Sequence, residues 1–313
     1  MSVLLTGVTG FVGKHVLEVL PNAKVIGRHR PQSVDVANFH ESSIDSNSDY
    51  SDAFDEILVV VHIAARVHVM NDKSVDPLGE FREVNTAGTM NLARQAVKAG
   101  VKRFIFVSSI KVNGESTLID RPFTGNDVRN PKDFYGQSKA EAEEQLLALA
   151  KETGLEVVII RPTLVYGPGV KANFASLLKF VSKGLPLPFG LIKDNKRSLV
   201  SVKNLVDLIV TCIAHPKAAN QVFLVSDDQD ISTASMVKHM SQALGKPCRL
   251  FPVPLWCYRV AGKLTGKTDV VERLLGSLQV DITHTKSVLG WIPPQTLEQG
   301  FKETAEAFLL NKK

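Results

Sequence analysis

Tyr135 and Lys139 have residue types and a spacing that suit proton transfer. They stand one helical turn apart, so both side chains would project from the same face of a helix. An ammonium close to a phenol favours the phenolate, which lowers the pKa of the tyrosine toward the working pH. The hydroxyl of Ser109, upstream in the chain, could hold a carbonyl or alcohol group in line with this pair. These residues predict an acid–base site, although the Tyr-x-x-x-Lys spacing also occurs on solvated helix faces.

The start of the chain has the pattern of a strand, a glycine turn and a helix. The apolar run Ser2–Leu5 precedes Thr-Gly-Val-Thr-Gly-Phe-Val-Gly, and an amphipathic stretch continues to Leu20. Gly7 allows a tight turn, Gly10 lets the backbone approach a pyrophosphate, and Gly13 lets helix and strand pack closely. The free N–H groups and the dipole at the helix start favour phosphate. The sequence therefore predicts a dinucleotide site at this turn.

Strand and helix patterns alternate through the first half of the chain. The expected strands are Val3–Leu5, Ala23–Ile26, Val34–Val36, Ile57–Ile63, Arg103–Val107 and Glu156–Ile160. The expected helices are Phe11–Leu20, Leu78–Ala99 and Gln137–Thr153, with Val202–Ala214, Ser232–Leu244 and Leu297–Leu310 later in the chain. A further apolar run, Val222–Val225, is interpreted as a return to the sheet. Such alternation predicts an α/β fold with a parallel sheet and right-handed crossovers.

The order of these motifs resembles that of the extended short-chain dehydrogenases/reductases, and of their nucleotide-sugar members in particular. The segments that carry the resemblance are Thr6–Gly13, His62–Ala65, Ser108–Ser109, Tyr135 with Lys139, Arg161–Pro162 and Leu289–Pro293. The resemblance implies a Rossmann-type doubly wound parallel sheet with a smaller, interleaved C-terminal substrate domain. Residues 1–165 and 198–226 are expected to form the dinucleotide-binding domain, and residues 166–197 and 227–313 the nucleotide-sugar-binding domain.

The same resemblance assigns roles to the acid–base residues. Tyr135 would exchange a proton with the sugar oxygen, Lys139 would lower its pKa and bind the nicotinamide ribose, and Ser109 would hydrogen-bond the reacting oxygen. Ser109 is preferred to Ser108 because the segment after it resembles the family's Ser-x-x-x-Tyr-Gly pattern. Asn113 stands where the family usually has the tyrosine of that pattern.

The residues after the second strand predict which cofactor binds. An acidic residue there would hydrogen-bond the ribose 2′-hydroxyl of NAD, but the chain has Arg28 and Arg30. Guanidinium groups suit the 2′-phosphate of NADP, so NADP(H) is favoured and NAD(H) is the alternative. A solvated loop is a competing interpretation of the two arginines. Asp45 is expected to approach the adenine.

Further cofactor and substrate contacts follow from the resemblance. The cofactor contacts expected in addition to those above are Thr9, Phe11, Val12, Ala64, Ala65, Asn85, Pro162 and Thr163. The residues expected on the substrate side are Arg66, Lys111, Asn173, Pro188, Arg197 and Arg273, of which the last two would bind the diphosphate. His62 is interpreted as structural, and His68 as either a residue bordering the sugar or a loop residue without a role.

Composition limits the classes of protein that fit. The chain has 313 residues, 44% of them hydrophobic, and a net charge of +5 whose basic residues are spread along the chain, so no nucleic-acid partner is expected. No apolar run reaches the length needed to cross a bilayer, so no stable membrane insertion is expected. Three cysteines without metal or disulfide spacing predict a cytoplasmic protein with no bound metal. The aromatic segment Leu255–Tyr258 is interpreted as core or as a lid, rather than as a membrane contact.

A homodimer is expected through the helical segments Leu78–Ala99 and Gln137–Thr153, as in the family. The apolar stripe of such an interface, or else a face against the sheet, would consist of Ala93, Ala96, Leu146 and Ala150.

Three functions remain open at the level of sequence. The favoured one is NADPH-dependent reduction of the 4-keto group of a UDP-4-keto-6-deoxyhexosamine for surface polysaccharides, which the arginines after the second strand support. The alternative is an NAD-dependent 4-epimerase of UDP-hexoses or UDP-N-acetylhexosamines, which uses the same three catalytic residues. A nucleotide-sensing protein without turnover is a third interpretation, which the presence of both Tyr135 and Lys139 disfavours.

Overall fold

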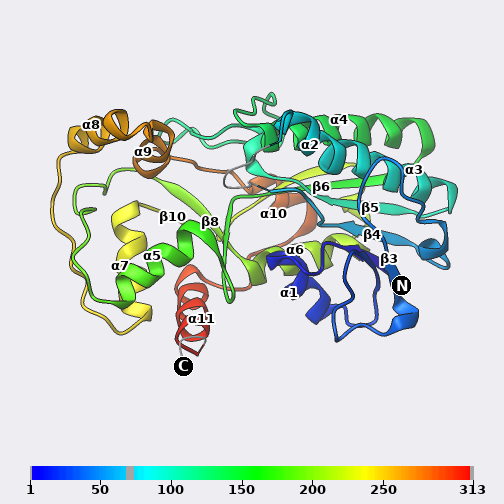
Figure 1. The fold of residues 1–313 in the computed structure, drawn as a ribbon, viewed down its shortest axis with the longest axis horizontal. Helices are drawn as coiled ribbons and strands as arrows, with labels where there is room; N and C mark the ends of the chain where they lie inside the picture. The colour runs from blue at the N-terminus through cyan, green and yellow to red at the C-terminus, as the bar shows by residue number, and fades with distance from the viewer. Residues whose placement is uncertain (1, 68–73, 311–313) are drawn as a thin grey trace.

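A computed structural model describes residues 2–67 and 74–310, so His68 lies outside the described residues. Seven parallel strands form the central sheet in the order β3-β2-β1-β4-β5-β6-β9 (Figure 1). Their bounds are β1 Val3–Thr6, β2 Lys24–Gly27, β3 Phe39–Glu41, β4 Val59–His62, β5 Arg103–Val107, β6 Glu156–Pro162 and β9 Gln221–Val225. The strand order reverses between β1 and β4, the position at which such sheets bind ligands at their carboxyl ends. The expected Rossmann-type doubly wound sheet is confirmed.

Helices cover both faces of this sheet (Figure 1). One face carries α1 Phe11–Val19 and α6 Val202–Ala214, and α10 Thr283–Leu289 adds Leu289 to the same apolar cluster. The opposite face carries α2 Pro77–Arg82, the π-helical segment η3 Glu83–Gly88, α3 Thr89–Lys98 and α4 Phe134–Thr153. Short 3-10 helices lie at η1 Val36–Asn38, η2 Ser51–Phe54, η4 Ile110–Val112 and η5 Pro216–Ala218.

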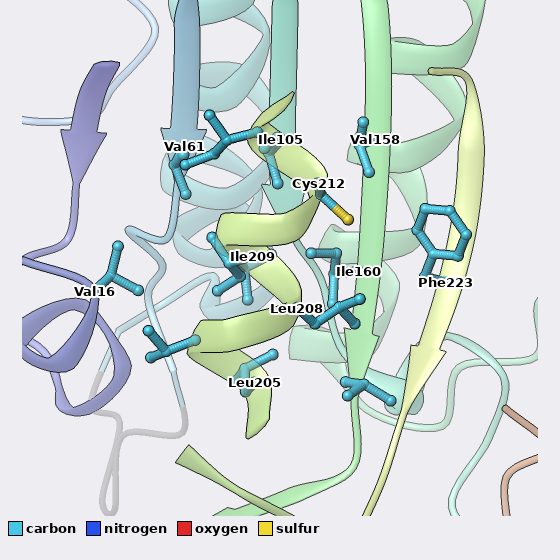
Figure 2. Close-up of a cluster of buried hydrophobic side chains, with 14 of the residues drawn as sticks. Val16, Val61, Ile105, Val158, Ile160, Leu205, Leu208, Ile209, Cys212 and Phe223 are labelled. Carbon is cyan, nitrogen blue, oxygen red and sulfur yellow. The ribbon is translucent and has the colours of Figure 1, made fainter. Parts of the chain in front are cut away.

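Alternate side chains of each strand point to opposite faces, so each strand contributes to two cores. Ile105 of β5 packs in the cluster under α6, which Figure 2 shows with Leu208, Ile209 and Cys212 of that helix. Its neighbour Phe104 belongs to the other cluster, under α3 and α4. Burial on both faces explains why the strands are continuous apolar runs.

A smaller unit lies beside the main sheet. Its three-stranded sheet has the order β10-β8-β7, from β7 Leu164–Tyr166, β8 Arg197–Ser201 and β10 Asp230–Ile231. A third apolar cluster joins this sheet to α5 Ala172–Ser182, α7 Thr233–Ala243 and α11 Leu297–Leu310. Two further helices, α8 Leu255–Thr265 and α9 Thr268–Leu275, lie at the end of the molecule away from β3 (Figure 1). After β6, the chain thus supplies α6, β9 and α10 to the main sheet and its other strands and most of its helices to this unit.

Several sequence predictions need correction. The expected strand Val34–Val36 is wrong, because the third strand is β3, which pairs with β2 after the turn η1. The expected single helix Leu78–Ala99 is interrupted by η3, where the hydrogen bonding widens to the π pattern. Helix α4 begins at Phe134 because Asp133 caps it, with its Oδ1 accepting a hydrogen bond from the N–H of Gly136 at 2.7 Å.

The apolar stripe considered for a dimer interface faces the sheet instead. Ala93, Ala96, Leu146 and Ala150 are all buried in the cluster under α3 and α4. Among residues 2–67 and 74–310, no helix combines the length and the apolar character needed to cross a bilayer. The same residues contain no group of three or more metal-ligating side chains that could hold an ion.

Candidate active site

The glycine turn between β1 and α1 has the shape of a phosphate cradle. Gly7 has a φ of +75°, and a Cβ there would lie 2.5 Å from the backbone nitrogen of Ala64. A Cβ on Gly13 would lie 2.1 Å from the carbonyl oxygen of Gly7. Gly10 is the N-cap of α1 and leaves the first N–H groups of the helix, from Phe11 onward, without a side-chain cap. These donors and the exposed backbone at Thr9 and Gly10 fit a cofactor diphosphate.

The loop after β4 lies against this turn. Thr6 Oγ1 accepts hydrogen bonds of 3.2 Å from the N–H groups of both Ile63 and Ala64. His62 is fully buried, and its two ring nitrogens lie 2.7 Å from Thr6 Oγ1 and 2.9 Å from Thr89 Oγ1. Burial, together with the nearby charge of Lys139, holds the pKa of His62 well below its usual value. These contacts agree with the interpretation of His62 as a structural residue.

Asn85 organises the next part of the loop, beyond Ala65. Its Oδ1 accepts a hydrogen bond of 2.8 Å from Arg66 N–H, and its Nδ2 donates to Arg66 O and to Ser138 Oγ, both at 3.0 Å. Asn85 lies in the π-helical segment η3, which turns its side chain toward α4. It therefore couples the cofactor loop to the helix that carries Tyr135 and Lys139.

The three residues expected to be catalytic meet at the carboxyl end of β5. Ser109 follows this strand, and its side chain is close enough to Tyr135, in the first turn of α4, to lower the pKa of the tyrosine. Lys139, one turn further, is fully buried. Its Nζ donates a hydrogen bond of 2.9 Å to Val107 O and lies 4.2 Å from the centre of the Phe106 ring. The tertiary structure thus brings together residues that are up to 30 positions apart in the sequence.

The pKa values differ from the sequence prediction. Burial and the Asp133 carboxylate raise the pKa of Tyr135 to about 12, although the hydrogen bond from Ser109 opposes them. Burial lowers the pKa of Lys139 to about 7, against the opposing charge of Glu143. The predicted lowering of the Tyr135 pKa is not found, because burial dominates the pKa of both groups.

A buried ionic network lies behind this site, and sequence reasoning missed its central residue. Glu143 is fully buried, and Arg161 at the end of β6 donates to it from Nε at 2.9 Å and from Nη2 at 2.5 Å. Ser108 Oγ donates to the same carboxylate at 2.6 Å, and Arg129 Nε donates at 3.1 Å. Arg161 also donates to Asn113 Oδ1 at 2.9 Å, so the residue that replaces the family's usual tyrosine has a structural role. The sequence signal that could have identified Glu143 is its position one helical turn after Lys139, on the same face of the helix.

Two residues expected on the substrate side lie close to these three. The Lys111 ammonium is paired with Asp133 and lies 3.3 Å from Glu115 Oε1, so carboxylates already neutralise it. The Arg66 guanidinium lies 3.6 Å from Glu80 Oε2 and 5.7 Å from the centre of the Phe81 ring. The Phe81 ring in turn makes an edge contact with Tyr135, at 6.4 Å between ring centres. Arg66 is thereby placed on the same side of the site as the tyrosine.

The two predicted diphosphate arginines lie next to each other, although they are 76 positions apart. Arg197 Nη1 donates to the carbonyl oxygens of Arg273, at 2.8 Å, and of Gly276, at 3.3 Å. Burial and the charge of Arg273 lower the pKa of Arg197. Neither arginine forms an ion pair with any residue that the structure describes. The charge of Arg273 thus acts on Arg197, and two such guanidinium groups without a paired carboxylate suit a diphosphate.

Two other substrate-side residues have less specific surroundings. Asn173 is exposed in the first turn of α5. Pro188 is half-buried in a segment whose neighbour Leu187 pairs with Arg249 and Phe251 through hydrogen bonds of 2.8 and 3.0 Å. Their roles stay predictions.

The residues expected to select the cofactor lie beyond β2 and in the loop after β3. Arg28 is exposed, whereas Arg30 Nη1 donates to Val34 O at 2.5 Å. Asp45 Oδ1 accepts hydrogen bonds from the N–H groups of Asn47 and Ser48, at 3.0 and 2.8 Å. At the other end of the site, Pro162 closes β6 and Thr163 Oγ1 donates to Val225 O at 3.3 Å. Two of these side chains, Arg30 and Asp45, therefore bond within their own loops.

Residues 3–226 match the family described as the NAD dependent epimerase/dehydratase family. The chain belongs to this family. It is an enzyme of the extended short-chain dehydrogenase/reductase type, and its cofactor is a nicotinamide dinucleotide. This assignment agrees with the glycine cradle and with the three residues at the end of β5.

Two curated relatives cover nearly the whole chain. A "UDP-glucose 4-epimerase" of Vibrio cholerae is 61% identical over 98% of this chain and 95% of its own length. An "N-acetyl-alpha-D-glucosaminyl-diphospho-ditrans,octacis-undecaprenol 4-epimerase" of Escherichia coli O157:H7 is 30% identical over 97% of this chain and 94% of its own length.

Solved structures have the same fold. The UDP-glucose 4-epimerase of Thermotoga maritima, solved with UDP-glucose, has a TM-score of 0.75 and 25% identity, with both chains fully covered. The UDP-glucuronic acid 4-epimerase of Bacillus cereus, solved with NAD, has a TM-score of 0.77 over the full length of both chains. At 19% identity, the second similarity is evidence for the fold alone.

Proposed function

We propose that this enzyme is a 4-epimerase of a hexose or N-acetylhexosamine carried on a diphosphate, most directly a UDP-sugar. The observation that carries the proposal is the 61% identity with the Vibrio cholerae UDP-glucose 4-epimerase over almost the whole of both chains. Ser109, Tyr135 and Lys139 at the end of β5 supply the groups that this reaction needs. The sequence alone favoured 4-keto reduction, with 4-epimerisation as the alternative. We now prefer the alternative.

The residues of the chain would act on the oxygen at C4 of the sugar. In the oxidising half of the cycle, the phenolate form of Tyr135 would accept the proton of the 4-hydroxyl. In the reducing half, the resulting phenol would return a proton to the same oxygen. Ser109, which lies near Tyr135, would hold that oxygen in line with the tyrosine side chain. Bound NAD would supply a reversible hydride acceptor for C4. Lys139 would bind the ribose of the cofactor, and its positive charge, one helical turn from Tyr135, would favour the phenolate.

We propose NAD, rather than NADP, as the cofactor of this cycle. An epimerase must return the same hydride that it removes, so it keeps its nicotinamide bound through turnover. Arg30 donates to its own loop at Val34, which weakens the argument that it grips a 2′-phosphate. Exposed Arg28 remains the one residue that favours NADP. Ala64, Ala65, Asn85, Pro162 and Thr163 are proposed to surround either nucleotide.

The diphosphate is proposed to lie at Arg197 and Arg273, which would hold its charge from one side. The substrates in the names of the two curated relatives both contain a diphosphate but differ in the group that carries it. That group is uridine in one name and undecaprenol in the other. The pair of arginines suits both carriers, because both contain the same charged group. The proposed division into a nucleotide-binding domain and a sugar-binding domain follows the boundaries expected from the sequence.

Two measurements test the proposal. The purified protein is denatured and the released nucleotide is identified, and the native protein is incubated with UDP-glucose or UDP-N-acetylglucosamine while the 4-epimer is followed. We expect that the released nucleotide is NAD and that at least one of the two UDP-sugars is converted to its 4-epimer. Tyr135→Phe should retain the nucleotide and lose most of the turnover, because only the proton donor is removed. Full activity of this variant, or no conversion of any diphosphate sugar by the wild type, would contradict the proposed mechanism.

The second candidate is the NADPH-dependent 4-keto reductase of surface-polysaccharide synthesis, which the exposed Arg28 favours. It predicts a protein that is purified without nucleotide, prefers NADPH in titration and consumes it stoichiometrically with a 4-keto sugar. The same release experiment therefore separates the two candidates.

A further inference from the structure

The helical hairpin formed by α8 and α9 exposes an apolar stripe that no described element covers. Trp256 is 64% exposed, Val260 46% and Leu264 82%, and they recur every fourth residue along one side of α8. Phe251 and Leu255, just before them, are 44% and 38% exposed. The interpretation of the Leu255–Tyr258 segment as core is therefore wrong for its tryptophan.

The packing inside the hairpin fixes which side of α8 faces outward. Gly262 is buried, and a Cβ on it would lie 2.8 Å from Val271 Cγ2 of α9. Gly262 is two residues from Val260, which places it about 200° around the helix, on the opposite side from the stripe. The hairpin thus closes on itself through its glycine side. The exposure of Trp256, Val260 and Leu264 is a result of this geometry.

The segment that carries this stripe is positively charged. Residues 246–267 contain no aspartate or glutamate and carry a formal charge of +5, equal to the net charge of the whole chain. The basic residues are all exposed, and they are Lys246, Arg249, Arg259, Lys263 and Lys267. None of them forms an ion pair with a residue in the described part of the chain. The acidic residues Asp269 and Glu272 follow only in α9.

A tryptophan, aliphatic side chains and flanking lysine or arginine on one helix are the composition of interfacial helices. We propose that the α8–α9 hairpin docks this enzyme on an anionic membrane surface. Trp256 and Leu264 would enter the boundary between headgroups and acyl chains, while Arg259 and Lys263 would contact lipid phosphates. An anionic bilayer favours a docking segment without acidic residues, because carboxylates would be repelled by the lipid phosphates. Docking on a protein partner would not require their absence.

The location of the hairpin gives the docking a consequence for the substrate. Arg273 belongs to α9, and its carbonyl oxygen accepts the hydrogen bond from Arg197. The proposed diphosphate site therefore lies at the base of the element that would touch the membrane. This consequence rests on the proposed function, but the docking itself does not, because it follows from the exposed stripe and its charge.

Sedimentation of the full chain with vesicles tests the proposal. We expect the wild type to sediment with vesicles of phosphatidylethanolamine and phosphatidylglycerol, to bind phosphatidylcholine vesicles less, and to dissociate as salt rises. Neutralising two charges in the variant Arg259→Gln/Lys263→Gln should weaken binding by about fivefold for each charge. Trp256→Glu/Leu264→Glu should abolish binding, because the insertion of the stripe is lost.

The tryptophans provide a direct readout. The chain has two, and the other, Trp291, is buried with its Nε1 donating to Asp207 Oδ1 at 2.7 Å. Brominated lipids should therefore quench the emission of Trp256 and leave Trp256→Phe unchanged on vesicle binding. Val36→Glu is the matched control, since Val36 is 74% exposed in the short helix η1, outside the hairpin.

The outcomes separate docking from catalysis. Turnover of a water-soluble UDP-sugar should be the same in the wild type and in Trp256→Glu/Leu264→Glu, so loss of vesicle binding with intact turnover supports the proposal. A wild type that does not bind anionic vesicles, or a control that binds as poorly as the stripe variant, overturns it. If the stripe variant instead converts a dimer into monomers in analytical ultracentrifugation, and the wild type ignores vesicles, the hairpin is an interface between two copies. The docking inference then fails while the proposed reaction stands.

Discussion

Replacing Glu143 by glutamine is expected to destabilise the protein strongly. The carboxylate is fully buried and accepts four hydrogen bonds, from Ser108, from two nitrogens of Arg161 and from Arg129. The amide of glutamine would keep one acceptor oxygen and turn an N–H₂ donor toward the guanidinium groups. The Arg161 side chain, 2% exposed, would then hold a buried charge without an anion. Removing one partner of such a pair costs about 3–5 kcal/mol.

Glu141, two residues earlier on α4, provides the matched control. It pairs with Arg82 at 2.6 Å, but its side chain is 28% exposed and that of Arg82 is 47% exposed. An exposed pair of this kind contributes about 0–1 kcal/mol, so Glu141→Gln should be nearly neutral. The two variants make the same chemical change on the same helix and differ in burial and in the number of bonds lost.

Urea unfolding followed by circular dichroism measures the difference. We expect a lower midpoint for Glu143→Gln at an unchanged slope, and a loss that is a large share of a total stability of about 5–15 kcal/mol. If the two variants lose similar free energies of unfolding, the reasoning from burial is refuted. If Glu143→Gln is the more stable of the two, the network does not stabilise the fold.

Three further predictions concern the cradle, the buried lysine and the diphosphate site. Gly13→Ala places a methyl group 2.1 Å from the carbonyl oxygen of Gly7, so this variant should lose nucleotide binding in fluorescence titration. The control Gly27→Ala, whose methyl group has no neighbour nearer than 3.8 Å, should bind the nucleotide normally. Equal binding by the two variants would contradict the tight-turn argument. Burial lowers the pKa of Lys139 to about 7 from 10.5, so the cost of its charge is fully present below pH 7 and disappears as the pH approaches 10.5. Lys139→Met should therefore be more stable than the wild type near about pH 6 and lose that advantage by about pH 10 in urea denaturation, and a constant difference would rule out this titration. Arg197→Met should raise KM for UDP-glucose by about tenfold or more at nearly constant kcat, because a hydrogen bond to a charged group contributes about 1.5–3 kcal/mol. A fall in kcat at constant KM would contradict a role of Arg197 in diphosphate binding.

Local patterns predicted the elements that carry the chemistry. The glycines after β1, the apolar strands and the spacing of Tyr135 and Lys139 each depend on a few neighbouring residues, and the structure has all of them. The π-helical turn at Asn85 and the position of β3 were missed. Both depend on contacts with other elements, since Asn85 bonds Arg66 and Ser138, and β3 pairs with β2.

The sequence by itself determined the α/β alternation, the Rossmann-type sheet and the positions of the proposed acid–base residues, because hydrogen bonding along helices and the two-residue period of strands are local. Only the tertiary structure decided the electrostatics. It buried Lys139 and raised the pKa of Tyr135, and it placed Arg197 beside Arg273. The pKa of a group depends on its loss of water and on charges from distant parts of the chain, and neither is encoded in spacing. The exposure of Trp256 was decided in the same way, because the hairpin packs through the opposite side of α8.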